Sequence, residues 1–172
     1  MQPIIIVLAV LGISAAHLPA QQSSDPWVTY PGGSGPGKGK HVVLIAGDEE
    51  YRSEEALPML GQILSRHHGF KCTVLFSVDD KGVIAPTNQA SISNPAALDS
   101  ADAIILALRF RNWPDTDMKH FVDAVNRGVP VIALRTSTHA FMYPKNRKDS
   151  KYATYSWNSK EWKGGFGRQV LG

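Results

Sequence analysis

Four apolar runs divide the chain, and within each of them apolar residues follow one another without alternating with polar ones. The runs are HVVLIA at 41–46, CTVLF at 72–76, DAIILAL at 102–108 and PVIAL at 130–134. Continuous apolar strands are typical of a parallel sheet that helices cover on both faces. The pattern therefore predicts four buried, parallel strands.

A helix is predicted between the third and fourth runs, over residues 115–127. Its apolar residues recur at i, i+3, i+4 and i+7 and form one stripe: Met118, Phe121, Val122 and Val125. Pro114 and Asp115 mark its start, and Gly128 with Pro130 marks its end. One face of this helix is expected to pack against the sheet.

A second helix is predicted over residues 53–68, after the first run. Ser53 is expected as its N-cap, and Glu54 and Glu55 suit the positive end of the helix dipole in the first turn. Gly69 provides the C-terminal stop. Pro58 removes one backbone donor, so the regular helix could instead begin near Leu57.

The order of elements is β-α-β-loop-β-α-β, in which residues 77–101 form a long irregular loop with one short helical turn near 95–98. Right-handed crossovers favour the strand order 2-1-3-4, with further strands beyond. This predicts an α/β fold, a doubly wound parallel sheet in a three-layer sandwich of the flavodoxin-like or glutaminase-like kind. After Tyr143 the pattern dissolves without a closing strand or helix, so the domain is expected to be truncated at its C-terminus.

The first forty residues differ in composition from the rest. Residues 1–20 contain an apolar run from Ile4 to Ile13 followed by small residues, which predicts a signal peptide and a secreted or periplasmic protein without a stable membrane span after cleavage. An uncleaved tether and a misassigned start codon are the alternatives. Residues 21–40 are rich in Gly, Pro and Ser and predict a flexible leader, so the folded domain is expected to span 41–172.

Charge and cysteine content exclude some functions. The chain of 172 residues has 18 Lys and Arg against 15 Asp and Glu, and its net charge of +3 is scattered. No dense basic block is present, so nucleic-acid binding is not expected. Cys72 is the single cysteine and lies in an apolar run, which is typical of a small buried hydrophobe.

Polar residues follow three of the predicted strands at their carboxyl ends, where open parallel sheets bind their ligands. Asp48 and Glu49 follow the first strand, Arg109 and Arg111 the third, and Arg135, Thr136, Ser137, Thr138 and His139 the fourth. The arginines would favour an anionic or hydroxyl-rich ligand. The alternative is that they pair with Asp48, Glu49 or Asp115 and hold the loops in place.

For several individual residues, more than one role is open. His139 is a candidate general base or metal ligand, or else a hydrogen-bonded loop histidine. No HxH or HExxH spacing supports a metal site, and metal and cofactor stay open. Ser137 lacks the GxSxG frame of a nucleophile. Five tail aromatics predict either a sugar-stacking wall or core contacts: Tyr152, Tyr155, Trp157, Trp162 and Phe166.

Three blocks of the sequence carry a resemblance to a known family: HVVLIAGDEEYRSEEALPMLGQIL, LRFRNWPDTDMKHFVDAVNRGVPVIALRTSTHAF and EWKGGFGRQVLG. Together they resemble the ThuA-like (trehalose utilisation) family, whose fold is that of class I glutamine amidotransferases. The catalytic cysteine of those amidotransferases corresponds to Thr136 or Ser137 here, so the resemblance implies a carbohydrate-related role without amidotransferase activity.

Two hypotheses follow, and whether the chain is an enzyme stays open. In the first, the chain binds or processes a carbohydrate or glycoside, with His139 as the catalytic candidate and with six ligand-binding residues: Asp48, Glu49, Arg109, Arg111, Arg135 and Thr136. In the second, it is a non-catalytic interaction or scaffold module whose loops are joined by salt bridges.

Overall fold

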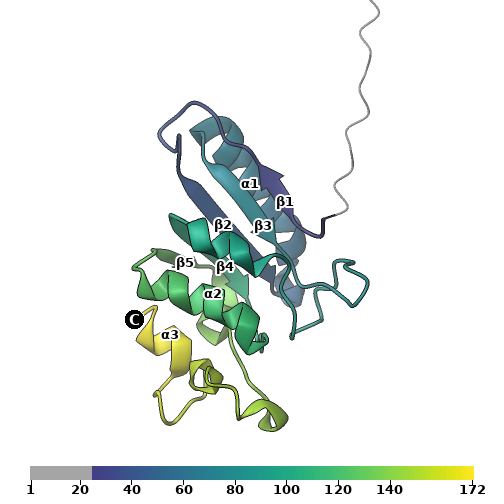
Figure 1. Ribbon diagram of the computed structural model, residues 1–172, viewed down its shortest axis with the longest axis vertical. Helices are drawn as coiled ribbons and strands as arrows, with labels where there is room; N and C mark the ends of the chain where they lie inside the picture. Colours follow the sequence, from purple (N-terminus) through teal and green to yellow (C-terminus); the bar gives the residue numbers. More distant parts are fainter. Residues whose placement is uncertain (1–24) are drawn as a thin grey trace, which may run out of the picture.

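The computed structural model describes residues 25–172, and the predicted signal peptide lies outside this range. The described part contains a five-stranded sheet in the order β1-β3-β2-β4-β5 (Figure 1). The strands are β1 (Val28–Tyr30), β2 (His41–Gly47), β3 (Lys71–Leu75), β4 (Ala103–Leu108) and β5 (Val131–Ala133).

The four predicted strands are present as β2 to β5, and neighbouring members are parallel. The prediction that all four are buried is wrong for the edge strand β5, whose Ile132 is 53% exposed. Their order, β3-β2-β4-β5, is the predicted 2-1-3-4 arrangement. Val43 in the middle of β2 pairs with Thr73 on one side and with Ile104 on the other. The chain is thus a mixed α/β protein, and strand order reverses at β2, whose carboxyl end is where a ligand site is expected.

Strand β1 differs from the expected flexible leader. It pairs with β3 in the antiparallel sense, with Val28 opposite Val74 and Tyr30 opposite Cys72. Val28 and Tyr30 also pack against the core cluster beneath α1. The composition of residues 21–40 does not indicate this pairing, because the partner strand lies about forty residues further along the chain.

Both predicted helices are present, as α1 (Ser53–His68) and α2 (Asp115–Asn126). Gly69 ends α1 in the left-handed conformation, as predicted. The prediction of Ser53 as N-cap is wrong: Arg52 takes that position, and the Ser53 hydroxyl accepts a hydrogen bond from Asp48 N over 2.8 Å. Pro58 is the sixth residue of the helix, where it removes the backbone donor that would bond Glu54 O, yet the helix begins at Ser53 and not near Leu57.

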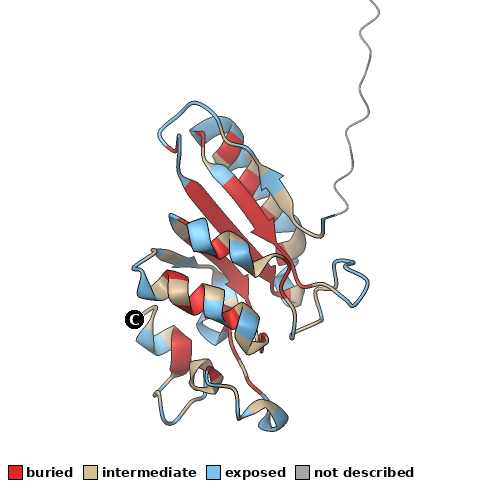
Figure 2. Cartoon of the chain, in the orientation of Figure 1, coloured by how far each residue is buried: buried red, intermediate tan, exposed pale blue. Residues whose placement is uncertain are grey.

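The two helices pack on opposite faces of the sheet (Figure 1). Leu57 of α1 packs with the residues of β2 and β3 that point to its face, whereas Met118 and Phe121 of α2 pack on the other face. The strands between them are buried along most of their length (Figure 2). Removing these side chains from water stabilises the fold by roughly 2 kcal/mol for each large residue.

Short helical turns lie in the connections between the strands and the helices. They are η1 (Glu49–Tyr51), η2 (Pro95–Ser100), η3 (Arg135–His139), η4 (Lys145–Arg147) and η5 (Ala153–Tyr155). The turn predicted near 95–98 is therefore confirmed as η2. The tail ends in α3 (Gly165–Gln169), whose Phe166 is buried among Phe121 and Phe141.

Over residues 25–172, none of the helices has the length and apolar character needed to cross a membrane.

Candidate functional site

Three of the predicted loops meet at the carboxyl ends of the parallel strands. The Thr136 hydroxyl donates to Asp48 Oδ2 and so joins the loop after β5 to the loop after β2. The backbone N–H groups of Phe110 and Arg111 donate to His139 O and Ala140 O, at 2.9 and 2.7 Å, and join the loops after β4 and β5. The predicted residues are therefore neighbours in space.

Arg111 holds these loops together from inside the protein. Its side chain has no exposed surface, and Nη2 lies 2.5 Å from Glu49 Oε2. Nη1 donates to Ser77 Oγ, Pro86 O and Asn88 O, all in the segment after β3, at 3.0 to 3.1 Å. Burial lowers the pKa of Arg111, and the charge of Glu49 opposes this shift. Arg111 thus has no surface left for a ligand.

Arg109 is tied to carboxylates in the same way, near the surface. Its Nη1 lies 3.4 Å from Glu49 Oε1 and 3.1 Å from Glu50 Oε2. The guanidinium also lies over the Phe110 ring, 4.6 Å from the centroid. Asp115 takes no part in this network, since it accepts from the Ser150 hydroxyl over 2.5 Å. Glu49 is therefore the carboxylate that both arginines share.

Asp48 is 1% exposed and organises the turn after β2. Its Oδ1 accepts from Glu50 N over 3.2 Å and caps η1, while its Oδ2 accepts from Thr136. These contacts use both carboxylate oxygens, so Asp48 fixes the loop in the described structure.

The exposed part of the crevice is a rim built on η3. Arg135 lies over the Tyr51 ring at 3.9 Å from its centroid, and it holds a left-handed backbone conformation with φ of 53°. His139, at the other end of η3, is exposed and its Nδ1 is hydrogen-bonded to Thr138 Oγ1 over 2.9 Å. Its ring lies 5.0 Å from that of Trp157. Arg135 and His139 are the predicted site residues that solvent reaches most freely.

Neither Ser137 nor Cys72 is placed to act as a nucleophile. The Ser137 hydroxyl is buried, accepts from Leu108 N over 3.0 Å and has Leu134 O and Leu106 O as acceptors at 2.8 and 3.1 Å. Cys72 lies inside β3, and burial raises the pKa of its thiol to about 11. A thiol in this state supplies very little thiolate near neutral pH.

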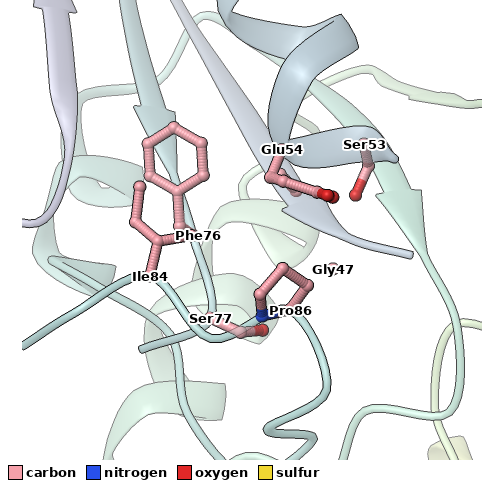
Figure 3. Close-up of a pocket in the computed structure, with 8 residues that line it drawn as sticks. Gly47, Ser53, Glu54, Phe76, Ser77, Ile84 and Pro86 are labelled. Atoms are coloured by element: carbon pink, nitrogen blue, oxygen red, sulfur yellow. The ribbon is translucent and has the colours of Figure 1, made fainter. Parts of the chain in front are cut away.

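A narrow cavity lies between the ends of β2 and β3, and Figure 3 shows Ser53 and Glu54 of α1 on one side of it and Ser77 and Pro86 on the other. It is too narrow for a water molecule. Glu54 Oε2 is buried there without a hydrogen-bond partner among the described residues. In the sequence, Glu54 is recognisable only as an acidic residue of a first helical turn. Its cavity is formed together with the loop after β3, so no local pattern indicates that it is buried there.

The tail forms two adjoining hollows that share Thr154 and Glu161, with volumes of ≈ 360 and ≈ 690 Å³. Tyr155 and Trp162 line the smaller hollow, and their ring centroids are 4.8 Å apart. The larger hollow is lined by hydroxyl, amide and ammonium groups, among them Ser156, Asn158, Ser159, Lys145, Lys148 and Lys160. Sequence reasoning identified the aromatics but missed Glu161, which no motif distinguishes.

The five tail aromatics therefore divide between the two predicted roles. Tyr152 and Phe166 are buried core residues, at 8% and 1% exposure. Trp157 is exposed, and Tyr155 and Trp162 are partly exposed beside a hollow. The core interpretation holds for the first pair. Tyr155 packs against Phe141 and borders the smaller hollow with Trp162, whereas Trp157 contacts His139.

Within residues 25–172, no three His, Cys, Asp or Glu side chains converge closely enough to hold a metal ion. Comparison of the chain with protein-family models, with curated proteins and with solved structures finds no significant match.

Proposed function

We propose that this chain is a carbohydrate-binding domain of an exported protein, with a ThuA-like, class I glutamine amidotransferase-like fold and without amidotransferase activity. One observation carries the proposal: in the tail, the Tyr155 and Trp162 rings border a hollow that also contains Glu161 and Thr154. The mixed α/β sheet and the ordered sequence blocks that resemble the family support the fold assignment.

The chemistry of this hollow suits a sugar. A pyranose ring has apolar C–H faces that pack on an aromatic ring, and a rim of hydroxyls that needs hydrogen-bond partners. Trp162 and Tyr155 offer the apolar surface, and a carboxylate such as Glu161 accepts hydrogen bonds from two neighbouring hydroxyls. The adjoining larger hollow offers hydroxyl, amide and ammonium groups for a second sugar unit.

The rim on η3 contacts the tail through His139. Ser156 and Asn158 line the larger hollow, and Trp157 between them contacts His139. A ligand longer than one sugar unit would extend from the hollow toward Trp157 and His139. In this proposal His139 contributes to binding, and the ion pairs that Glu49 makes with Arg109 and with the buried Arg111 keep the rim in place.

The absence of amidotransferase activity is proposed because thioester chemistry needs an accessible thiolate. Cys72 is buried in β3 and its thiol pKa is about 11. Ser137, one of the two residues that correspond to the family's elbow, directs its hydroxyl to backbone groups of β4, and Thr136, the other, donates to Asp48.

A thermal-shift panel of mono- and disaccharides, trehalose included, tests the proposal on the full chain. At least one sugar is expected to raise the melting temperature, and Glu161→Gln is expected to abolish that shift. Glu55→Gln, an equal change at an exposed position on α1, is the matched control and should keep it. A panel without any shift, or a shift that Glu161→Gln leaves intact, would refute the assignment to this hollow.

A non-catalytic scaffold module is the second candidate, and the ion pairs favour it. Two of the three predicted site arginines are bound to Glu49 and Glu50 rather than presented to a ligand. In that case no sugar binds, and the exposed rim of Tyr51, Arg135 and Trp157 contacts a protein. The thermal-shift panel therefore separates the two candidates.

A further inference from the structure

Besides the two hollows of the tail, another hollow lies at the opposite end of the sheet, where β2 and β3 begin. Its volume is ≈ 410 Å³, and it is formed by the first residues of both strands, His41 and Lys71, together with the loop that precedes β2. Figure 1 shows this loop at the end of the sheet opposite to the tail. Since β2 has seven residues, the hollow is about 20 Å from the carboxyl-end crevice.

The loop that forms the hollow is held by backbone contacts. Gly33 N donates to Gly69 O over 3.1 Å, Gly37 N donates to His68 O over 2.8 Å, and Lys71 N donates to Lys40 O over 2.9 Å. At Gly32, φ is +77° and a Cβ would lie 2.7 Å from Lys71 N, so only glycine fits. The walls are thus fixed before any ligand arrives, which lowers the entropic cost of binding.

Three lysines line this hollow: Lys38, Lys40 and Lys71. Lys40 is paired with Asp102, at 3.1 Å between Nζ and Oδ1. Lys38 and Lys71 have no carboxylate partner among the residues that the structure describes, and both are exposed. Two ammonium groups of this hollow therefore have no paired carboxylate. Together they create a positive electrostatic potential in a concave site, which attracts an anion.

His41 forms the floor of the hollow. His41 is 7% exposed, and its ring nitrogens are hydrogen-bonded to Ser100 Oγ over 3.0 Å and to Thr73 Oγ1 over 2.9 Å. Burial lowers its pKa, and the charge of Lys71 lowers it further. The carboxylate beside this floor, Asp102, accepts from His41 N over 2.8 Å and is paired with Lys40, so it does not neutralise Lys38 or Lys71.

We propose that this hollow is an anion-binding site for the phosphate or sulfate ester group of a small ligand, with Lys38 and Lys71 as its principal contacts and Lys40 as a third. A tetrahedral oxyanion suits ammonium groups, which act as point charges and approach from several directions. The site is separate from the carbohydrate surface and does not depend on it.

Calorimetric titration of the full chain with inorganic phosphate and with inorganic sulfate, at constant ionic strength set by chloride, tests the proposal. Binding of phosphate, sulfate or both above the chloride background is expected. The double variant Lys38→Gln/Lys71→Gln should weaken it by about tenfold or more, because each lost ammonium removes a charge-assisted contact. Both side chains are exposed, so the variant is expected to fold.

The matched control is Lys81→Gln/Lys163→Gln, which removes the same charge at exposed positions outside the hollow. It is expected to leave the affinity within about twofold of the native value, since distant exposed charges are screened. Preference for phosphate or for sulfate identifies the ester class. Equal weakening in both double variants, or no binding of either anion to the native chain, would overturn the proposal.

Discussion

Glu49 Oε2 and Arg111 Nη2 lie 2.5 Å apart and join the loop after β2 to the loop after β4. The arginine side chain has no exposed surface, whereas the glutamate side chain is 26% exposed. The same guanidinium donates to Ser77 and to two carbonyl groups of the long loop after β3. A single buried cation therefore positions three loops at the carboxyl edge of the sheet.

Substitution of Glu49 tests this structural role. Glu49→Gln leaves the buried guanidinium without its counter-charge, and breaking such a pair is expected to lower the free energy of unfolding by about 2–4 kcal/mol. Urea unfolding followed by far-UV circular dichroism measures the loss.

Glu50→Gln is the matched control for that measurement. Glu50 also pairs with Arg109, at 3.1 Å, but its side chain is 53% exposed. The loss is therefore expected to stay below about 1 kcal/mol. Equal losses in the two variants would show that burial of Arg111 does not govern the effect.

Phe166 tests whether the tail belongs to the core. Its ring lies 5.3 Å from Phe141 and 5.6 Å from Phe121, between ring centroids, and it is 1% exposed. Phe166→Ala is expected to cost about 3–5 kcal/mol by leaving a cavity in the aromatic cluster. Trp157→Ala, at an exposed position of the same tail, should cost far less. Similar stabilities for Phe166→Ala and the native chain would mean that the tail is not packed.

Alkaline pH should weaken the fold through Cys72. Its thiol has a pKa of about 11 in the folded chain and 9.0 as the ordinary value, so the folded state holds the proton more tightly. Stability is full below pH 9 and falls as pH rises from 9 to 11, by up to about 2 kcal/mol from this group. Urea midpoints at pH 8 and pH 10.5 should differ less in Cys72→Ala than in the native chain; identical differences would contradict the assignment.

Acidic pH should weaken the fold through His41. Its folded pKa is lowered from the ordinary value of 6.5, mainly by burial, so the unfolded state binds the proton first. The contribution of neutral His41 is present above pH 6.5 and is lost as pH falls through and below this value. His41→Gln should unfold more easily at pH 8 yet show a flatter decline between pH 7 and pH 5. A decline as steep as that of the native chain would assign the sensitivity to other groups.

The parallel strands, both long helices and the strand order could be predicted from the sequence because each depends on local patterns. Apolar runs identify β2 to β5, and the stripe from Met118 to Val125 identifies α2. The edge strand β1 was missed because its three residues are stabilised by pairing with β3 and by packing against a distant core cluster, neither of which a local pattern records. The N-cap of α1 was misassigned because Ser53 bonds back to Asp48 from inside the helix.

The site was predicted less completely, for a related reason. Strand ends located Asp48, Arg109, Arg111 and Arg135 at one edge, yet sequence alone left open which charges pair. The structure shows Arg111 buried with Glu49 and Arg135 exposed over Tyr51. Glu161 is identified as a candidate only in the structure, where it lines a hollow with Trp162. A hollow in an irregular segment leaves no periodic pattern in the sequence.

Isothermal titration calorimetry of the full chain measures whether Trp162 and its hollow bind a sugar. The sugar with the largest thermal shift is titrated into the native chain, Trp162→Ala, Trp162→Phe and Tyr51→Ala. Trp162→Ala is expected to raise the Kd by about tenfold, as loss of a stacked aromatic surface predicts, and Trp162→Phe to restore part of the affinity. Tyr51→Ala, at the crevice rim, should leave the Kd within about twofold. If Trp162→Ala binds the sugar as tightly as the native chain, the hollow beside Trp162 is not the sugar-binding site.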